Sequence, residues 1–261
     1  MNRASYLLIL LFTTANAAEF LLMKASGLNV YLVGIIMFAT SGVLLSWVLL
    51  IKHRKIFISS SFPHSLIILI GVISILVNVL WFKGLELTSP THVALLGKSD
   101  VIFSLLISMF LLKESIGKKN SLFILLMVVG MLGVMKIQLS DFSSFNPGDV
   151  FIILSAALLA FNAFLIRKAM KSTGPFEIAF VNCVFNTIGF AFLFFLNKGY
   201  LYSFDQKGIT IAIIAGVVAF LFFAGYYPSI RIFPLYTVRV LALLTPIITV
   251  IGDVFFLKKT C

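Results

Sequence analysis

The chain has 261 residues, of which 61% are hydrophobic and only 11% charged, and its mean hydropathy is +1.14. Soluble domains carry about 25% charged residues, so this composition excludes a water-exposed globular fold, and so apolar a chain would not remain solvated and disordered. A membrane-spanning helix takes about 20 apolar residues, which gives about nine spans and leaves no room for a soluble catalytic domain. The net charge of +11 falls in short clusters between apolar runs, a pattern typical of membrane-protein orientation signals and not of nucleic-acid binding.

Nine apolar runs predict nine membrane-spanning helices. Their expected ranges are 4–23, 29–51, 65–82, 93–112, 120–135, 149–166, 176–196, 209–227 and 234–257. Ala15-Asn16-Ala17 imitates a secretion-signal cleavage site, but apolar residues continue past it, so we expect a retained first span. Asn146-Pro147-Gly148-Asp149 predicts a turn followed by an acidic residue at a helix start.

The sequence contains an internal repeat. A shift of 144 residues places Phe20, Leu21, Lys24 and Ala25 on Phe164, Leu165, Lys168 and Ala169. A shift of 145 places Val93, Leu96, Leu112 and Lys113 on Val238, Leu241, Leu257 and Lys258. The repeating unit holds five helices, and because five is odd the second copy enters the membrane from the opposite side. We therefore predict an all-α integral membrane fold, a polytopic helical bundle of two inverted five-helix repeats over residues 1–140 and 146–261, as in secondary transporters.

Three stretches resemble a known family. They are GDVFIILSAALLAFNAFLIRKAMKSTGP (148–175), LWFKGLELTSPTHVALL (80–96) and FLLKESIGKKNSLFILLMVVGMLGV (110–134). Their order and spacing are similar to those of the drug/metabolite transporter superfamily, specifically its EamA-like branch with two five-helix halves. The resemblance implies a ten-helix transporter of small organic molecules.

The sequence departs from that family's pattern in three places. The usual proline of the fourth helix is absent, and Asp100 and Val101 stand there, whereas the second copy keeps Pro246. Glu114 at the exit of the fourth helix has Lys259 as its counterpart. The counterpart of the fifth helix would begin after the last residue, so we expect the second repeat to be one helix short.

Ionisable side chains within the expected spans are candidate functional residues. A charge at the bilayer centre costs at least about 2.5–3.5 kcal/mol, so such residues are rare without a role. The candidates are Glu19, Lys98, Asp100, Arg239 and Asp253. A carboxylate among them could carry a coupling proton, and a cation could bind an anionic substrate such as an amino acid carboxylate. Structural pairing or snorkelling towards the headgroups is the alternative.

The geometry of an ideal helix adds two expectations about these charges. Glu19 and Lys98 lie at similar depth, so an ion pair between the first and fourth helices is one hypothesis. Lys98 and Asp100 are about 200° apart around one helix, so they are not expected to face one cavity together.

Polar and aromatic side chains give weaker indications. Asn162 and Asn182 are candidate substrate contacts, although asparagine more often joins helices by hydrogen bonds, as we also expect for Asn16 and Asn186. Trp47, Trp81, Tyr200, Tyr202, Tyr226 and Tyr227 lie near expected helix ends and are interpreted as interfacial aromatic belts, with pathway lining an alternative for Trp81.

These observations favour a secondary transporter of small organic metabolites, such as amino acids or drug-like compounds, that works by alternating access and is coupled to protons. The alternatives are an inactive or non-transporting membrane protein from a truncated transporter gene and, less favoured, an integral-membrane enzyme acting on lipids. No catalytic set, metal-ligand spacing or nucleotide-binding loop is recognisable, so neither an enzyme, a metal nor a cofactor is expected. We expect a multi-pass protein of the bacterial inner membrane with a cytoplasmic N-terminus; its partners would be the bilayer, a small-molecule substrate and no nucleic acid, and a homodimer is left open.

Overall fold

The computed structural model describes residues 3–53, 63–88, 96–113, 146–197 and 205–245, together with the single positions 117, 122, 125, 126, 129 and 248. All regular structure within these residues is helical, which confirms the predicted fold class. The six long helices are α1 (Arg3–Ser26), α2 (Val30–His53), α3 (His64–Leu87), α7 (Pro147–Ala169), α8 (Pro175–Leu196) and α9 (Gln206–Ile232). Three elements are shorter: the 3₁₀ helix η1 (Gly97–Ser99), α5 (Asp100–Phe110) and α10 (Leu235–Leu241).

The six long helices coincide with six of the predicted spans. Five of them, α2, α3, α7, α8 and α9, are long and apolar enough to cross a membrane, and the apolar part of α1 covers Leu7–Met23. The expected spans 93–112 and 234–257 are described only in part, and 120–135 lies almost wholly outside the described residues. The total of nine spans therefore stays a prediction.

The start of α7 shows how the local sequence sets a helix boundary. The side chain of Asn146 accepts hydrogen bonds from the backbone N–H groups of Gly148 and Asp149, while Asp149 Oδ2 accepts from the backbone N–H of Asn146 at 2.9 Å. This reciprocal capping box, with Pro147 in the first turn, satisfies N–H groups that the first turn leaves unpaired. The predicted turn with an acidic residue at a helix start is confirmed.

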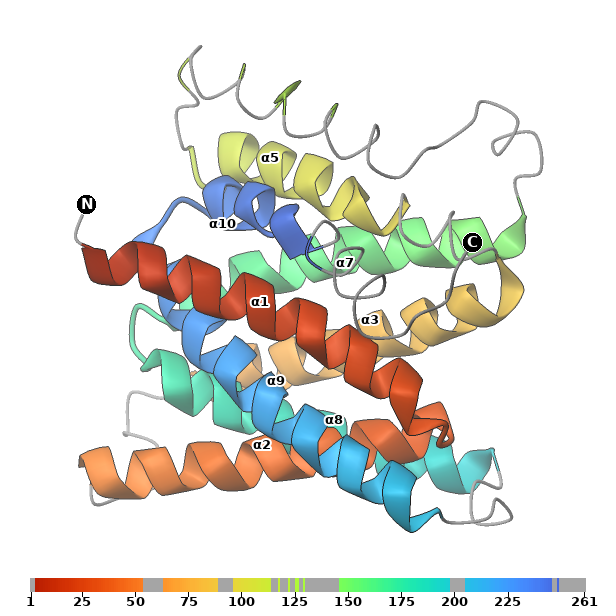
Figure 1. Cartoon of the computed structure of the whole chain (residues 1–261). Helices are drawn as coiled ribbons and strands as arrows, with labels where there is room; N and C mark the ends of the chain where they lie inside the picture. The colour runs from red at the N-terminus through yellow and green to blue at the C-terminus, as the bar shows by residue number, and fades with distance from the viewer. Residues whose placement is uncertain are drawn as a thin grey trace.

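Each long helix packs mainly against a helix of the other half rather than against one of its own half. α1 packs along α9, α3 along α7, and α2 against α8, so the main neighbour of each belongs to the other half (Figure 1). The 144–145-residue shift relates α1 to α7, α2 to α8, and α3 to α9, so the pair α1–α9 is the counterpart of α7–α3. The packing thus follows the repeat found in the sequence.

Small residues allow helices of the two halves to approach each other closely. A Cβ at Gly216 of α9 would lie 2.5 Å from Thr40 Cβ and 3.0 Å from the Met37 carbonyl oxygen of α2. Ser41 uses the same contact to donate a hydrogen bond to the Gly216 carbonyl at 2.8 Å. Small residues that bring two backbones together are the usual basis of helix packing in membranes.

Candidate functional site

The helices that carry the candidate charges are interrupted at equivalent places in the two halves. In the first half, the 3₁₀ helix η1 precedes α5, and in the second half α10 ends at Leu241 and is followed by a turn at 242–243. A shift of 145 places η1 on residues 242–244. Interrupted membrane helices leave backbone groups open near the binding sites of transporters, and short 3₁₀ stretches often mark hinges.

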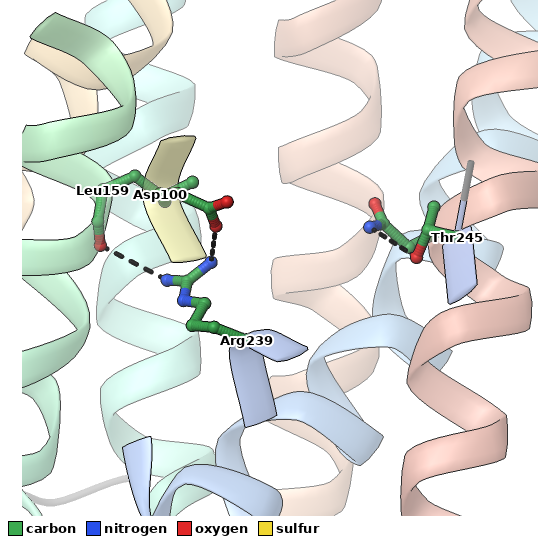
Figure 2. A network of polar contacts seen from close by, with 5 residues as sticks. Asp100, Leu159, Arg239 and Thr245 are labelled. Carbon is green, nitrogen blue, oxygen red and sulfur yellow. Dashed lines mark hydrogen bonds and ion pairs between the residues drawn. The ribbon is translucent and has the colours of Figure 1, made fainter. Parts of the chain in front are cut away.

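Asp100 and Arg239 meet across this pair of interruptions. Arg239 Nη1 donates to Asp100 Oδ2 at 3.2 Å, and Arg239 Nη2 donates to the Leu159 carbonyl oxygen of α7 at 3.3 Å. Figure 2 shows the Arg239 side chain reaching from α10 to both groups. Asp100 lies in the first turn of α5 and Arg239 in the last turn of α10, where the helix dipoles favour an anion and a cation respectively.

This ion pair is almost fully enclosed but incompletely bonded. The side chains of Arg239 and Asp100 are only 7% and 8% exposed. Asp100 Oδ1 and Arg239 Nε have no hydrogen-bond partner, so the pair is not the two-bond arrangement that Arg and a carboxylate can form. Each partner therefore retains one buried atom that can bind another polar group.

Tyr226 of α9 completes the surroundings of Arg239. The guanidinium carbon lies 5.3 Å from the centre of the Tyr226 ring, within cation–π range. Tyr226 is 7% and Tyr227 1% exposed, so the interpretation of these two residues as an interfacial belt is wrong. The reason is the length of α9, which continues through Pro228 to Ile232 and places both tyrosines inside the bundle.

Lys98 joins this group, but Glu19 does not pair with it. Lys98 lies in η1, two residues before Asp100 in the chain. No ion pair links Glu19 and Lys98 in the part of the chain that the structure describes, so the proposed pairing of the first and fourth helices is not formed. We call Lys98, Asp100 and Arg239 the charge layer; its formal charge is one positive in excess. The expectation that Lys98 and Asp100 would not face one cavity together stays a prediction.

A neutral contact occupies the corresponding place in the second half. Asn16 Nδ2 of α1 donates to Thr245 Oγ1 at 3.4 Å, and Thr245 is the counterpart of Asp100 under the 145-residue shift. Figure 2 labels Thr245 on the right of the view, apart from Asp100 and Arg239 on the left. The two halves thus place a carboxylate and a hydroxyl at equivalent positions, which makes the site asymmetric.

The asparagines of α8 belong to a separate polar network. Asn186 Nδ2 donates to Ser74 Oγ at 2.9 Å, and Asn186 Oδ1 accepts from Asn78 Nδ2 at 2.7 Å, so α8 is bonded to α3. Asn182 Nδ2 donates to the Tyr227 hydroxyl at 2.7 Å and Asn182 Oδ1 accepts from Asn186. With these partners, the Asn186 amide joins α8 to α3 of the other half, whereas the Asn182 amide joins α8 to α9 within the second half.

The remaining candidates have different surroundings. Asn162 of α7 is 4% exposed and its Oδ1 has no partner. Glu19 lies half-buried on α1, and Asp253 lies outside the described residues. Within the described segments, no group of three or more His, Cys, Asp or Glu side chains could hold a metal ion.

Sequence reasoning did not single out several residues that the structure shows in polar contacts. Ser74, Asn78 and Thr245 bond candidates that had been recognised, while Ser104 and Ser108 are fully buried on α5 without partners. The four-residue spacing of Asp100, Ser104 and Ser108 in an otherwise apolar helix was the available signal.

Comparisons with known proteins agree with this architecture. A solved structure, titled only as the crystal structure of a protein, matches with a TM-score of 0.77 and 16% identity, covering 100% of this chain and 91% of the other, and at that identity it shows the fold alone. No curated protein sequence matches. The model of the EamA-like transporter family matches twice, over residues 3–136 and 146–261. The chain therefore belongs to the EamA-like transporter family, whose members are membrane transporters of small molecules.

Proposed function

We propose that the protein is a secondary transporter of small organic metabolites that carry a carboxylate, amino acids among them, and that it binds them at the charge layer. The observation that supports this most is the incomplete Asp100–Arg239 pair, which joins the two halves and retains unbonded polar atoms on both partners. Arg239 and Lys98 together outnumber Asp100, so a substrate carboxylate would neutralise the excess charge. The free Oδ1 of Asp100 could then receive a substrate ammonium group.

The way the halves are joined supports alternating access as the mechanism. Residues 1–140 and 146–261 would form two inverted halves that rock about the charge layer and expose it to each side in turn, as in other transporters built from inverted repeats. Asp100 belongs to the first half and Arg239 to the second, so relative movement of the halves would strain or break their contact. A substrate that bridges the two charges in one state would bias that movement.

Asp100 is also our candidate for proton coupling, with Glu19 as the second. A buried carboxylate that alternates between a cation and water can exchange a proton during the cycle. We further propose that the protein lies in the bacterial inner membrane with its N-terminus in the cytoplasm, as the Lys and Arg bias of the loops indicates.

Reconstitution into proteoliposomes tests this function. A panel of radiolabelled carboxylates, amino acids, neutral compounds and cations is offered with and without an imposed pH gradient. We expect gradient-dependent accumulation of at least one carboxylate-bearing compound, with Arg239→Gln reducing it more than the matched Arg231→Gln, whose side chain is exposed at the end of α9. The absence of flux above protein-free liposomes for every compound would contradict the proposal, and so would flux restricted to cations.

A further inference from the structure

One face of α5 carries buried polar side chains that the charge layer does not account for. Asp100, Ser104 and Ser108 are spaced four residues apart, so they follow one another along a single helix face. Their exposed fractions are 6%, 0% and 0%. The opposite face is apolar and exposed, with Ile102 and Leu106 at 57% and 45%. We call Asp100, Ser104 and Ser108 the polar row.

Each member of the polar row has a polar atom without a protein partner. These atoms are Oδ1 of Asp100 and Oγ of Ser104 and Ser108. Serine in an apolar helix usually returns its hydroxyl to the carbonyl four residues earlier, as Ser41 and Ser229 do in this chain. Ser104 and Ser108 do not. Because an unsatisfied buried polar group costs about 1–3 kcal/mol, three in succession require another partner.

Nearly all of the unsatisfied atoms belong to α5 and to the two helices that pack against it, α7 and α10. Asn162 Oδ1 of α7 and Arg239 Nε of α10 also lack partners, and α5 packs against both of these helices. Asn162 follows by one turn Leu159, whose carbonyl accepts from Arg239. Among the described residues, Thr173 Oγ1 is the one other buried side-chain atom without a partner. All but one of the unpartnered atoms among the described residues therefore lie on three helices, α5 and its neighbours α7 and α10.

We propose that the polar row is a water-binding file, in which ordered water molecules connect the Asp100–Arg239 pair with the end of α5 near Phe110. Residues four apart on a helix are separated by about 6 Å along its axis, and a water molecule with two hydrogen bonds of about 2.8 Å bridges nearly that distance. Buried waters occupy sites that offer two to four polar partners, and the unpartnered atoms of these helices supply such partners. If the proposed proton coupling holds, the file supplies the aqueous route to Asp100 that it needs.

The second half repeats the spacing in its sequence. A shift of 145 places Thr245, Thr249 and Asp253 on Asp100, Ser104 and Ser108. Thr249 and Asp253 lie outside the described residues, so this correspondence is one of sequence alone. Hydroxyl and carboxyl side chains at four-residue intervals thus occur in the same place in each repeat.

Thiol accessibility tests the file without any substrate, so its outcome is independent of the transport assay. In a background with Cys183→Ala and Cys261→Ala, Ser104→Cys and Ser108→Cys are treated in membrane vesicles of both orientations with a charged methanethiosulfonate reagent. Leu106→Cys, on the exposed face between them, is the matched control. We expect positions 104 and 108 to react at least about tenfold faster than 106, because the reagent needs a thiolate and therefore water. Reaction from either side supports the file.

Equal or slower reaction at 104 and 108 than at 106 would overturn the proposal. If the cysteine variants fold poorly, thermal unfolding of alanine variants gives a second test. If the hydroxyls bind water, Ser104→Ala and Ser108→Ala remove hydrogen bonds and lower the unfolding temperature in detergent. If the hydroxyls are dry and unsatisfied, the same substitutions remove a cost and raise it, which would also contradict the file.

Discussion

Arg239 is held by three kinds of contact at once: an ion pair with Asp100, a hydrogen bond to the Leu159 carbonyl, and the face of Tyr226. A buried pair of this kind adds little net stability over an apolar pair of the same volume, because desolvation offsets the attraction between the charges. Removing one partner is different, since it leaves the other charge enclosed and uncompensated. At the scale of single residues, the charge layer therefore favours a binding role over a stabilising one.

The first prediction concerns this pair. Asp100→Asn and Arg239→Gln should each lower the free energy of unfolding by about 3–5 kcal/mol, because each leaves one buried charge without its counter-ion. The double variant should recover much of that loss while still failing to transport. Unfolding in detergent measures the first effect, with Arg231→Gln as the control for loss of an exposed arginine. Single variants as stable as the native protein would contradict a buried Asp100–Arg239 ion pair.

The second prediction separates the asparagine network from the proposed binding site. Asn186→Leu removes the bonds to Ser74 and Asn78 and should lower the free energy of unfolding by about 1–2 kcal/mol. The KM for transport should stay close to its native value. The control is Thr187→Val, which loses only a bond to the Cys183 carbonyl within α8. A large rise in KM with unchanged stability would instead make Asn186 a substrate contact.

The position, the ends and the packing of the helices depend on different features of the sequence. Length and hydropathy suffice for the long helices, and the caps at Asn146 and Asp205 sharpen their starts. The interruption after α10 has no such signal, because Ala242 and Leu243 are as apolar as the residues of a continuous span, whereas η1 consists of Gly97, Lys98 and Ser99. The close approach of two helices depends on single small residues such as Gly216.

A third prediction tests the approach of α2 and α9. Gly216→Leu places a side chain where the Thr40 Cβ and the Met37 carbonyl already lie, so the helices must separate. We expect a loss of at least about 1–3 kcal/mol of stability and a lower yield of folded protein, measured by size-exclusion chromatography and thermal unfolding. Val217→Leu adds a single methylene group at a neighbouring position that is 43% exposed and should have little effect. Equal behaviour of the two variants would contradict the tight crossing.

Some features of the structure could be predicted from the sequence and others could not. The long helices and the two-repeat fold were predictable, because hydropathy and internal similarity are properties of the sequence itself. Lys98, Asp100 and Arg239 could be nominated individually by the cost of burying charge. Their grouping could not, since Asp100 and Arg239 are separated by 139 positions and meet only through packing. The hypothesis of a Glu19–Lys98 pair failed for that reason, because equal depth does not make two helices neighbours.

At the scale of the whole molecule, the two halves are interleaved. α1 packs on α9, α3 on α7 and α2 on α8, so every long helix forms part of the boundary between halves (Figure 1). Relative movement of the halves must therefore alter many contacts together, which favours a small number of discrete arrangements over continuous deformation. Asp100 and Arg239 of the charge layer come from opposite sides of this boundary, so the proposed movement would alter the proposed binding site.

A disulfide across the boundary tests the account most directly. A Cβ at Gly42 of α2 lies 3.5 Å from the Cβ of the native Cys183 of α8, at the short end of the range found in disulfides. The measurement is the flux of a transported carboxylate into proteoliposomes containing Gly42→Cys, before and after oxidation, with Gly42→Ala and Gly42→Cys/Cys183→Ala as controls. The account predicts that oxidation stops transport in Gly42→Cys alone and that reduction restores it. Undiminished flux through fully cross-linked protein would contradict alternating access by rocking of the two halves.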